Sequence, residues 1–197
     1  MNYPNADEFL DVLFRNARTH RSWRPEPVTR ETLAAVYDLV KWGPTTNNTC
    51  PARFVFVVST AAKQRLKPYL NQGNVEQTML APATVIIGYD LAFYEFMPKL
   101  SSNPGARESW QKRSPADLHE TAFRNGSLQA GYMIIAARAL GLDCGPMSGF
   151  DNPGVDREFF TGTAIRSNLL CNLGHGDGGS LRPRASRLDF DEACRIL

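Results

Sequence analysis

The stretch that decides the fold is residues 114–151, SPADLHETAFRNGSLQAGYMIIAARALGLDCGPMSGFD. Ser114 can cap a helix, and Pro115 suits a first helical position because its missing N–H is not needed there. The pattern predicts one long helix that runs to Leu140 and stops at Gly141. Its centre is rich in small and apolar residues, which predicts a central, closely packed helix: Ala130, Gly131, Ala136, Ala137 and Ala139.

On either side of this helix, three short apolar runs predict buried strands: Phe54–Val58, Ala83–Tyr89 and Ser167–Leu173. Amphipathic patterns predict further helices from about Asp7 to Arg18, after the cap residue Thr29 as far as Gly43, over Ala61–Leu70, and from Asn152 to near Phe160. Helices outnumber strands and do not alternate with them strictly. This order favours an α+β fold over a doubly wound one.

The composition is that of an ordinary globular domain. The 197 residues are 43% hydrophobic and 21% charged, with a net charge of +2. They predict a single domain over residues 1–197 with a tail from about 175 to 197. The small net charge gives no reason to expect nucleic-acid binding. No secretion signal and no apolar run of ~20 residues is visible, so we expect a soluble, cytoplasmic protein without a membrane partner. The four cysteines and three histidines are scattered, which predicts reduced thiols and no metal site.

Four loop-like segments carry chemically particular side chains: Arg18–Trp23, Pro44–Asn48, Gly145–Asp151, and a late cluster of Arg182, Arg184 and Arg187. Together they supply arginines with hydroxyl and amide groups. Guanidinium groups with hydroxyl donors suit an anionic small ligand such as a phosphate. The alternative is that surface arginines pair with nearby carboxylates, and that residues 145–149 form a helix-terminating turn. Nucleotide-binding glycine motifs and the Gly-x-Ser-x-Gly nucleophile motif are absent. An enzyme of this kind would take its chemistry from an organic cofactor.

Taken in order, Arg18-Thr19, Pro44–Phe54, Gly141–Asp151 and Arg187-Leu188 resemble the flavin nitroreductases, from about residue 10 to the C-terminus. The details LDCGPMSGFD and FDEAC resemble a RutE-like branch, whose proposed activity is reduction of malonic semialdehyde to 3-hydroxypropionate in pyrimidine degradation. The resemblance implies a central, mostly antiparallel sheet flanked by helices and an intertwined homodimer. It also implies FMN as the cofactor, NADH or NADPH as the electron donor, and a small-molecule acceptor.

The resemblance also implies a role for each segment. Arg18, Thr19 and His20 would hold the FMN phosphate, with Arg21 as the alternative if the match is set by Trp23, and Arg184 and Arg187 would return to the same phosphate. Pro44, Thr45, Thr46 and Asn48 would lie against the partner's flavin. Asn74, expected just before a short helix, would contact the pyrimidine edge. Pro146, Met147, Ser148 and Gly149 would place a backbone N–H, that of Ser148, near flavin N5. No side chain is assigned as catalytic.

Some positions depart from the family pattern. Cys50, Ala52 and Ser148 stand where the family has glutamine, tryptophan and glutamate, which puts the usual substrate pocket in doubt. We expect residues Pro98–Ser114 to form a surface segment, and one hypothesis makes it a lid whose Arg107, Lys112 and Arg113 select an anionic acceptor, with Trp110 covering the site. The alternatives are a general nitroarene or quinone reductase, a flavin-binding module without turnover, and a helical protein that binds an acidic partner. The choice between NADH and NADPH stays open.

Overall fold

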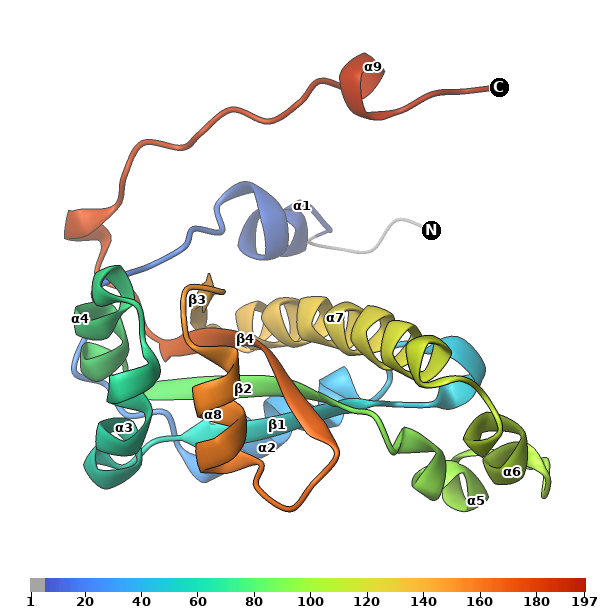
Figure 1. Cartoon of the computed structure of the whole chain (residues 1–197). Coiled ribbons are helices and arrows are strands. Elements are labelled where there is room, and N and C mark those ends of the chain that lie inside the picture. The colour runs from blue at the N-terminus through green and yellow to red at the C-terminus, as the bar shows by residue number, and fades with distance from the viewer. Residues whose placement is uncertain (1–5) are drawn as a thin grey trace.

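A four-stranded antiparallel sheet lies at the centre of the computed structural model, which describes residues 6–197 (Figure 1). Its strands are β1 (Ala52–Val57), β2 (Ala83–Asp90), β3 (Asp143–Met147) and β4 (Ile165–Gly174), in the order β1-β2-β4-β3. Every residue of β2 is buried, since β2 lies between β1 and β4 with helices over both faces. The expected α+β class is confirmed, and so are the three expected strands.

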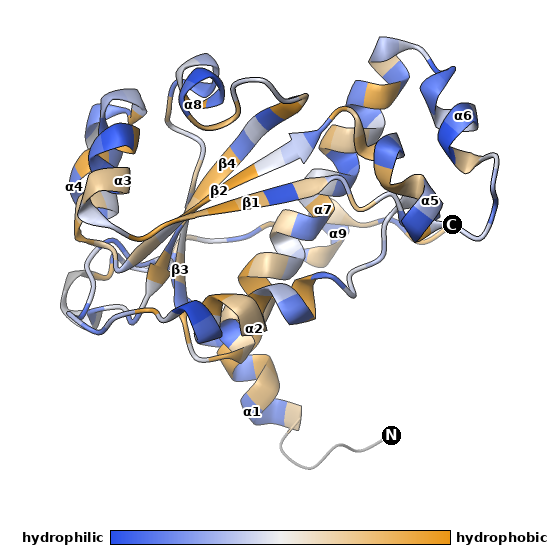
Figure 2. Cartoon of the chain, turned by 90° about the horizontal axis from the view of Figure 1, so that it is seen from below, coloured by the Kyte–Doolittle hydropathy of each residue, from blue (hydrophilic) through white to orange (hydrophobic). Residues whose placement is uncertain are grey.

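One face of the sheet is covered by α2 (Arg30–Val40) and by α7 (Pro115–Ala139), the long helix that the sequence predicts (Figure 2). The Ser114 hydroxyl accepts from the Asp117 N–H at 3.1 Å, and Gly141 follows with φ +78°, as its stop signal requires. Ala130, Ala136 and Ala137 face the chain's own core, where they let the helix pack closely on the sheet.

The opposite face is covered by α3 (Thr60–Leu66), α4 (Gln72–Leu80) and α8 (Asn152–Phe159) (Figure 2). Leu66 from α3 and Val155 from α8 pack in one apolar cluster with Ile86 of β2 and Leu170 of β4. The two faces of β2 therefore serve two different cores, which explains why the strand reads as a continuous apolar run.

The expectation of a loop or simple turn at Gly145-Pro146-Met147 is wrong, because these residues belong to β3. Proline suits this strand because β4 is the one strand among the described residues that pairs with β3, and the bridge from Thr19 on its other side is at Cys144 rather than at Pro146. A missing N–H at Pro146 therefore breaks no second ladder. Asn74 was expected before a helix but lies within α4, whose N-cap is Asn71.

Near the N-terminus, the helix expected to reach Arg18 is shorter. It consists of α1 (Ala6–Leu10) and a π-helical turn, Asp11–Arg15, after which the chain extends and Thr19 bridges to Cys144 of β3. The helix expected over Ala61–Leu70 divides at Lys67, where a 3₁₀ turn (Lys67–Tyr69) follows α3. The tail leaves the body of the protein as an extended chain carrying the short α9 (Phe190–Ala193) (Figure 1).

The segment expected as a polar surface excursion is folded. It contains α5 (Met97–Leu100) and α6 (Ala106–Gln111), and Trp110 is buried with its ring centroid 5.2 Å from that of Phe93. Trp110 was expected to cover the site from a surface segment, and this expectation is wrong. The side chain belongs to the buried apolar cluster between α5, α6 and the start of α7.

Lys63 of α3 is buried and holds the C-terminal end of α4. Its Nζ donates to the carbonyls of Thr78, at 3.1 Å, and of Ala81, which lack partners within the helix. Burial lowers the pKa of Lys63, which is the cost of placing its charge there.

We expect Lys63→Met to lower the free energy of unfolding by about 1.5–3 kcal/mol, because a charge-assisted donor is lost while the carbonyls stay buried. Urea unfolding of the holoprotein measures this. Lys67→Met is the matched control, since Lys67 is exposed nearby. Equal stability of the two variants would show that Lys63 does not support α4.

Candidate functional site

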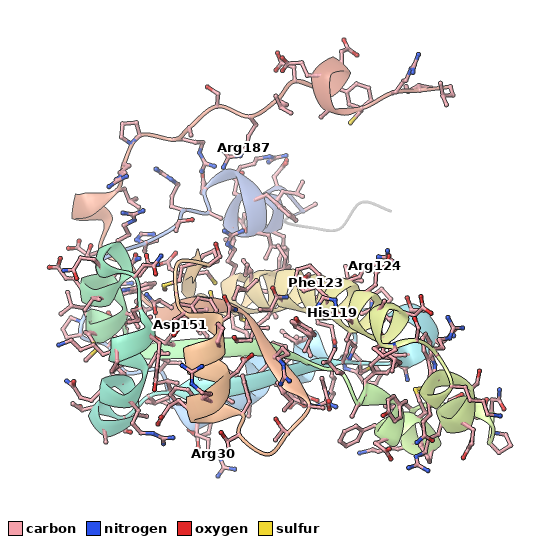
Figure 3. All side chains as sticks on the ribbon, in the orientation of Figure 1. Arg30, His119, Phe123, Arg124, Asp151 and Arg187 are labelled. Carbon is pink, nitrogen blue, oxygen red and sulfur yellow. The ribbon has the colours of Figure 1, made fainter. Side chains whose placement is uncertain are left out.

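Six arginines from three separate segments line one cleft of about 500 Å³, the arginine cleft. The loop after the first helix contributes Arg18 and Arg21 together with Thr19, and the C-terminal end of α7 contributes Arg138. The tail contributes the remaining three: Arg182, Arg184 and Arg187, the last of which is labelled in Figure 3. The fold thus brings together arginines up to 169 positions apart, since Arg18 and Arg187 both line the cleft. Of its lining residues, Arg18, Thr19, Arg184 and Arg187 were expected.

Backbone carbonyls fix several of these guanidiniums. Arg184 donates to the carbonyls of Arg15, at 2.7 Å, and Ala17, at 3.0 Å, and Arg18 donates to the carbonyl of Arg182. Within residues 6–197, none of the six arginines forms an ion pair with a carboxylate. The alternative of ordinary surface ion pairs therefore fails for this cleft, which carries concentrated, uncompensated positive charge.

His20, the third residue expected at the phosphate, does not line the arginine cleft. Its ring is buried, with Nε2 3.4 Å from Oδ1 of Asp143. Oδ2 of Asp143 accepts from the Gly176 N–H at 2.8 Å, and a Cβ on Gly176 would overlap the His20 ring. His20 and Asp143 thus connect the N-terminal loop with the start of β3 and with the beginning of the tail.

A second group of expected residues meets at the far end of β3. The Asn74 amide donates to the Gly149 carbonyl at 2.8 Å, and the Gln77 amide donates to Asn74 Oδ1 at 2.6 Å. Trp23 in turn donates to the Gln77 carbonyl at 3.1 Å. These bonds connect the N-terminal loop with Gly149, so they fix the turn that contains Ser148.

The two groups lie along one strand. Thr19 bridges to Cys144, and Ser148 is four residues further on, or about 13 Å at the rise of a β-strand. Ser148 also borders a larger cleft of about 850 Å³ between α7, α8 and β4. The arginine cleft and the Ser148 turn therefore lie near opposite ends of β3.

The larger cleft contains charged, polar and aromatic groups that sequence reasoning missed, among them Arg166 and Asn168 of β4. Tyr89 lies at its edge, and its hydroxyl is 3.1 Å from Nε2 of His119, which stacks on Phe123 (Figure 3). Burial first, and then the Asp156 carboxylate, raise the pKa of Tyr89. The tyrosine hydroxyl therefore stays protonated near neutral pH and can donate a hydrogen bond.

The loop with Pro44, Thr45, Thr46 and Asn48 lies elsewhere. Its Thr46 N–H donates to Oδ1 of Asn125 on α7 at 2.8 Å. Asn125 and Arg138 are thirteen residues apart on this helix, or about 20 Å. Within one chain, this loop and the arginine cleft are therefore too far apart to contact the same phosphate.

The same loop has a strained backbone. Asn47, Asn48 and Cys50 have φ of 48°, 56° and 41°, a left-handed conformation that non-glycine residues seldom adopt. Asn48 is held by its amide donating to the Leu100 carbonyl at 3.0 Å, which ties the loop to α5. A strained backbone of this kind persists because surrounding contacts hold it, and it is typical of segments that present groups to a ligand or a partner.

Arg138 and Arg182 are cleft residues to which the sequence analysis gave no role. Arg138 had one usable signal, because it is a lone charge in the apolar last turns of α7. Arg182 was noticed as part of a basic cluster but was not assigned to the cofactor. Over the described chain, no group of three metal-ligating side chains occurs, and no helix is long and apolar enough to cross a membrane.

Comparison with known proteins places the chain in a family. Residues 14–175 match the Nitroreductase family. A Burkholderia lata protein named NADH dehydrogenase/NAD(P)H nitroreductase is 56% identical over 191 residues, 97% of each chain. A protein of the same name from Stenotrophomonas maltophilia is 57% identical over 187 residues, 95% of each.

A solved structure shares the fold. A nitroreductase from Exiguobacterium sibiricum in complex with FMN has a TM-score of 0.85 at 16% identity, with 100% of both chains covered. With the two close relatives and the family match, this chain belongs to the nitroreductase family.

Proposed function

We propose that this chain, an NAD(P)H-dependent oxidoreductase that uses FMN, reduces malonic semialdehyde to 3-hydroxypropionate as a member of the RutE-like branch. The observation that carries the cofactor assignment is the arginine cleft, with its six guanidiniums and no paired carboxylate among the described residues. The observation that bears on the acceptor is the polar cleft beside Ser148. The four free cysteines suit a reducing cytoplasm.

The residues present fit FMN. A phosphate monoester carries nearly two negative charges at neutral pH, which two or three guanidiniums can neutralise. Arg18, Arg184 and Arg187 would hold it, together with the Thr19 hydroxyl. Flavin mononucleotide is long enough to span the roughly 13 Å from Thr19 to the Ser148 turn. The flavin, when bound, supplies the hydride chemistry that no side chain of this site provides.

At the other end, the turn would meet the flavin ring. Asn74 would face the pyrimidine edge, and the Ser148 N–H would lie beside N5, where a fixed donor holds the ring. The Asn74–Gly149 and Gln77–Asn74 hydrogen bonds pre-organise this turn, because they fix its backbone without any ligand. Pro146 and Met147 serve as the strand that delivers the turn, through their pairing with Cys171 and Leu170.

A homodimer would complete the site. The loop with Thr45 and Thr46 is far from the chain's own arginine cleft, so it would serve the flavin of the partner. On α7, an apolar stripe faces outward at helical spacing and includes Leu128 and Tyr132, which are 44% and 40% exposed. A Cβ on Gly131, between them, would meet nothing within 4 Å, which leaves room for a second helix. Exposed apolar faces of this kind mark interfaces.

For the acceptor, we propose that Arg166 meets its carboxylate. Arg166 Nε lies 4.0 Å from Oδ2 of Asp156, a loose pairing, and one terminal nitrogen donates to the Ile165 carbonyl at 2.9 Å. Part of the guanidinium is therefore left for the acceptor. The lid hypothesis for residues 98–114 stays a prediction, but two of its three cations are engaged. Arg107 pairs with Glu95 at 2.6 Å, and Arg113 stacks over Trp110 at 4.4 Å.

The test is anaerobic reduction of the holoprotein with NADH and NADPH, followed by reoxidation with malonic semialdehyde, propanal, a nitroarene and a quinone. Propanal has the same carbon skeleton without the carboxylate. We expect kcat/KM for the semialdehyde to exceed that for propanal by about tenfold or more, and Arg166→Gln to abolish the difference while leaving the nitroarene unaffected.

The alternatives predict other results. Reoxidation by nitroarenes and quinones alone would favour a general reductase and refute the semialdehyde proposal. A yellow protein that neither NADH nor NADPH bleaches would be a flavin-binding module. A protein that binds no FMN, but does bind an acidic polypeptide, would overturn the enzyme assignment itself.

A further inference from the structure

The arginine cleft carries more positive charge than FMN can neutralise. Six guanidiniums line it, whereas one phosphate monoester brings about two negative charges. The cleft has a volume of about 500 Å³. A water molecule takes up only about 30 Å³ in the liquid, and a phosphate group has just five heavy atoms, so one phosphate leaves most of this space free. The cleft therefore has charge and space for a second anionic group.

Two of the arginines differ from the others. The side chains of Arg21 and Arg182 are exposed and make no hydrogen bond or ion pair with any described residue. Arg18 and Arg184, by contrast, are fixed by the backbone, and Arg187 donates to the carbonyls of Ala185 and Ser186. The pre-organised arginines suit a permanently bound cofactor, and the two unengaged ones suit a ligand that enters and leaves.

Resting on the proposed function, we infer that Arg21 and Arg182 bind the 2′-phosphate of NADPH, so that this enzyme prefers NADPH to NADH. The two donors differ only in this dianion. Guanidinium groups bind phosphate through a planar pair of N–H donors, which makes arginine the suitable residue for such discrimination.

The distribution of charge between the two clefts supports placing the 2′-phosphate at Arg21 and Arg182. The larger cleft beside Ser148 contains Arg157 and Arg166 but also Asp156, which offsets part of their charge. No carboxylate of residues 6–197 lines the arginine cleft. The adenosine half of a donor that approaches this site is therefore attracted toward Arg21 and Arg182, and a 2′-phosphate strengthens that attraction.

The experiment compares holoprotein variants Arg21→Gln, Arg182→Gln and their combination with the wild type. Arg24→Gln is the matched control, because Arg24 is a neighbouring cation that pairs with Glu26 outside the cleft. The first measurement is the ratio of kcat/KM for NADPH to that for NADH. The second is calorimetric binding of 2′,5′-ADP and 5′-AMP, which needs no turnover.

We expect the wild type to favour NADPH by about tenfold or more and to bind 2′,5′-ADP correspondingly tighter than 5′-AMP. The double variant should bring both ratios close to one, because kcat/KM for NADPH falls about tenfold or more further than kcat/KM for NADH. FMN should be retained, since Arg18, Arg184 and Arg187 are left in place. Rising ionic strength should weaken the preference in the wild type, because an exposed charge pair is screened.

Contrary results distinguish failure of this inference from failure of the proposed function. A wild-type ratio near one, or a double variant that keeps the preference, would overturn the inference and leave the flavin enzyme intact. Loss of FMN from the double variant would assign both arginines to the cofactor, which also overturns it. If neither donor reduces the wild-type flavin, the proposed function itself fails.

Discussion

Replacing Arg18 by alanine should weaken FMN binding by about ten- to hundredfold, because one charge-assisted contact to phosphate contributes about 1.5–3 kcal/mol. Arg187→Ala should have a similar effect from the other side of the arginine cleft. Dialysis of the holoprotein followed by FMN titration measures both. The double variant should be largely free of flavin, since only Arg184 remains of the three arginines that would hold the phosphate.

Two controls separate charge from geometry. Arg18→Lys should recover only part of the affinity, because lysine keeps the charge but loses the planar fork. Arg24→Ala, outside the cleft, should bind FMN as the wild type does. Full flavin retention by both Arg18→Ala and Arg187→Ala would disprove the assignment of the arginine cleft to the phosphate.

Leu128→Arg should convert a dimer into a 21.9 kDa monomer and strip it of FMN. Leu128 is 44% exposed on the outward stripe of α7, where an interface would bury it. A charge buried there without a partner is costly, so we expect the dimer to weaken by at least about a hundredfold. FMN would be lost with it, because in the proposed dimer the loop of residues 44–48 comes from the partner.

Leu80→Arg is the matched control, since Leu80 is 61% exposed at the end of α4, away from α7. Sedimentation velocity with absorbance at protein and flavin wavelengths gives mass and FMN content together. A Leu128→Arg protein that stays dimeric would place the interface elsewhere. A monomer that retains FMN would show that one chain suffices for the site.

Much of the fold could be predicted because its signals are local. The cap at Ser114 and the stop at Gly141 determine the long helix, and the apolar runs determine three strands. The edge strand β3 was missed because glycine and proline are ordinary turn residues, and only its position at the edge of the sheet makes them acceptable in a strand. Asn74 was displaced by a few residues because α4 has little apolar periodicity to reveal its start.

For the candidate site, too, part could be predicted from the sequence and part only from the structure. The sequence by itself determined which residue types could bind a phosphate, since arginine and hydroxyl groups express that chemistry wherever they lie. Only the tertiary structure decided which of them act together. It joined Arg18 to the tail, added Arg138 from α7, turned His20 toward Asp143, and left Thr45 and Thr46 about 20 Å away along the helix. The physical reason is that a binding site depends on the distances between its side chains. Strand pairing and helix packing set these distances, and both join segments far apart in the chain, so no local sequence pattern encodes them.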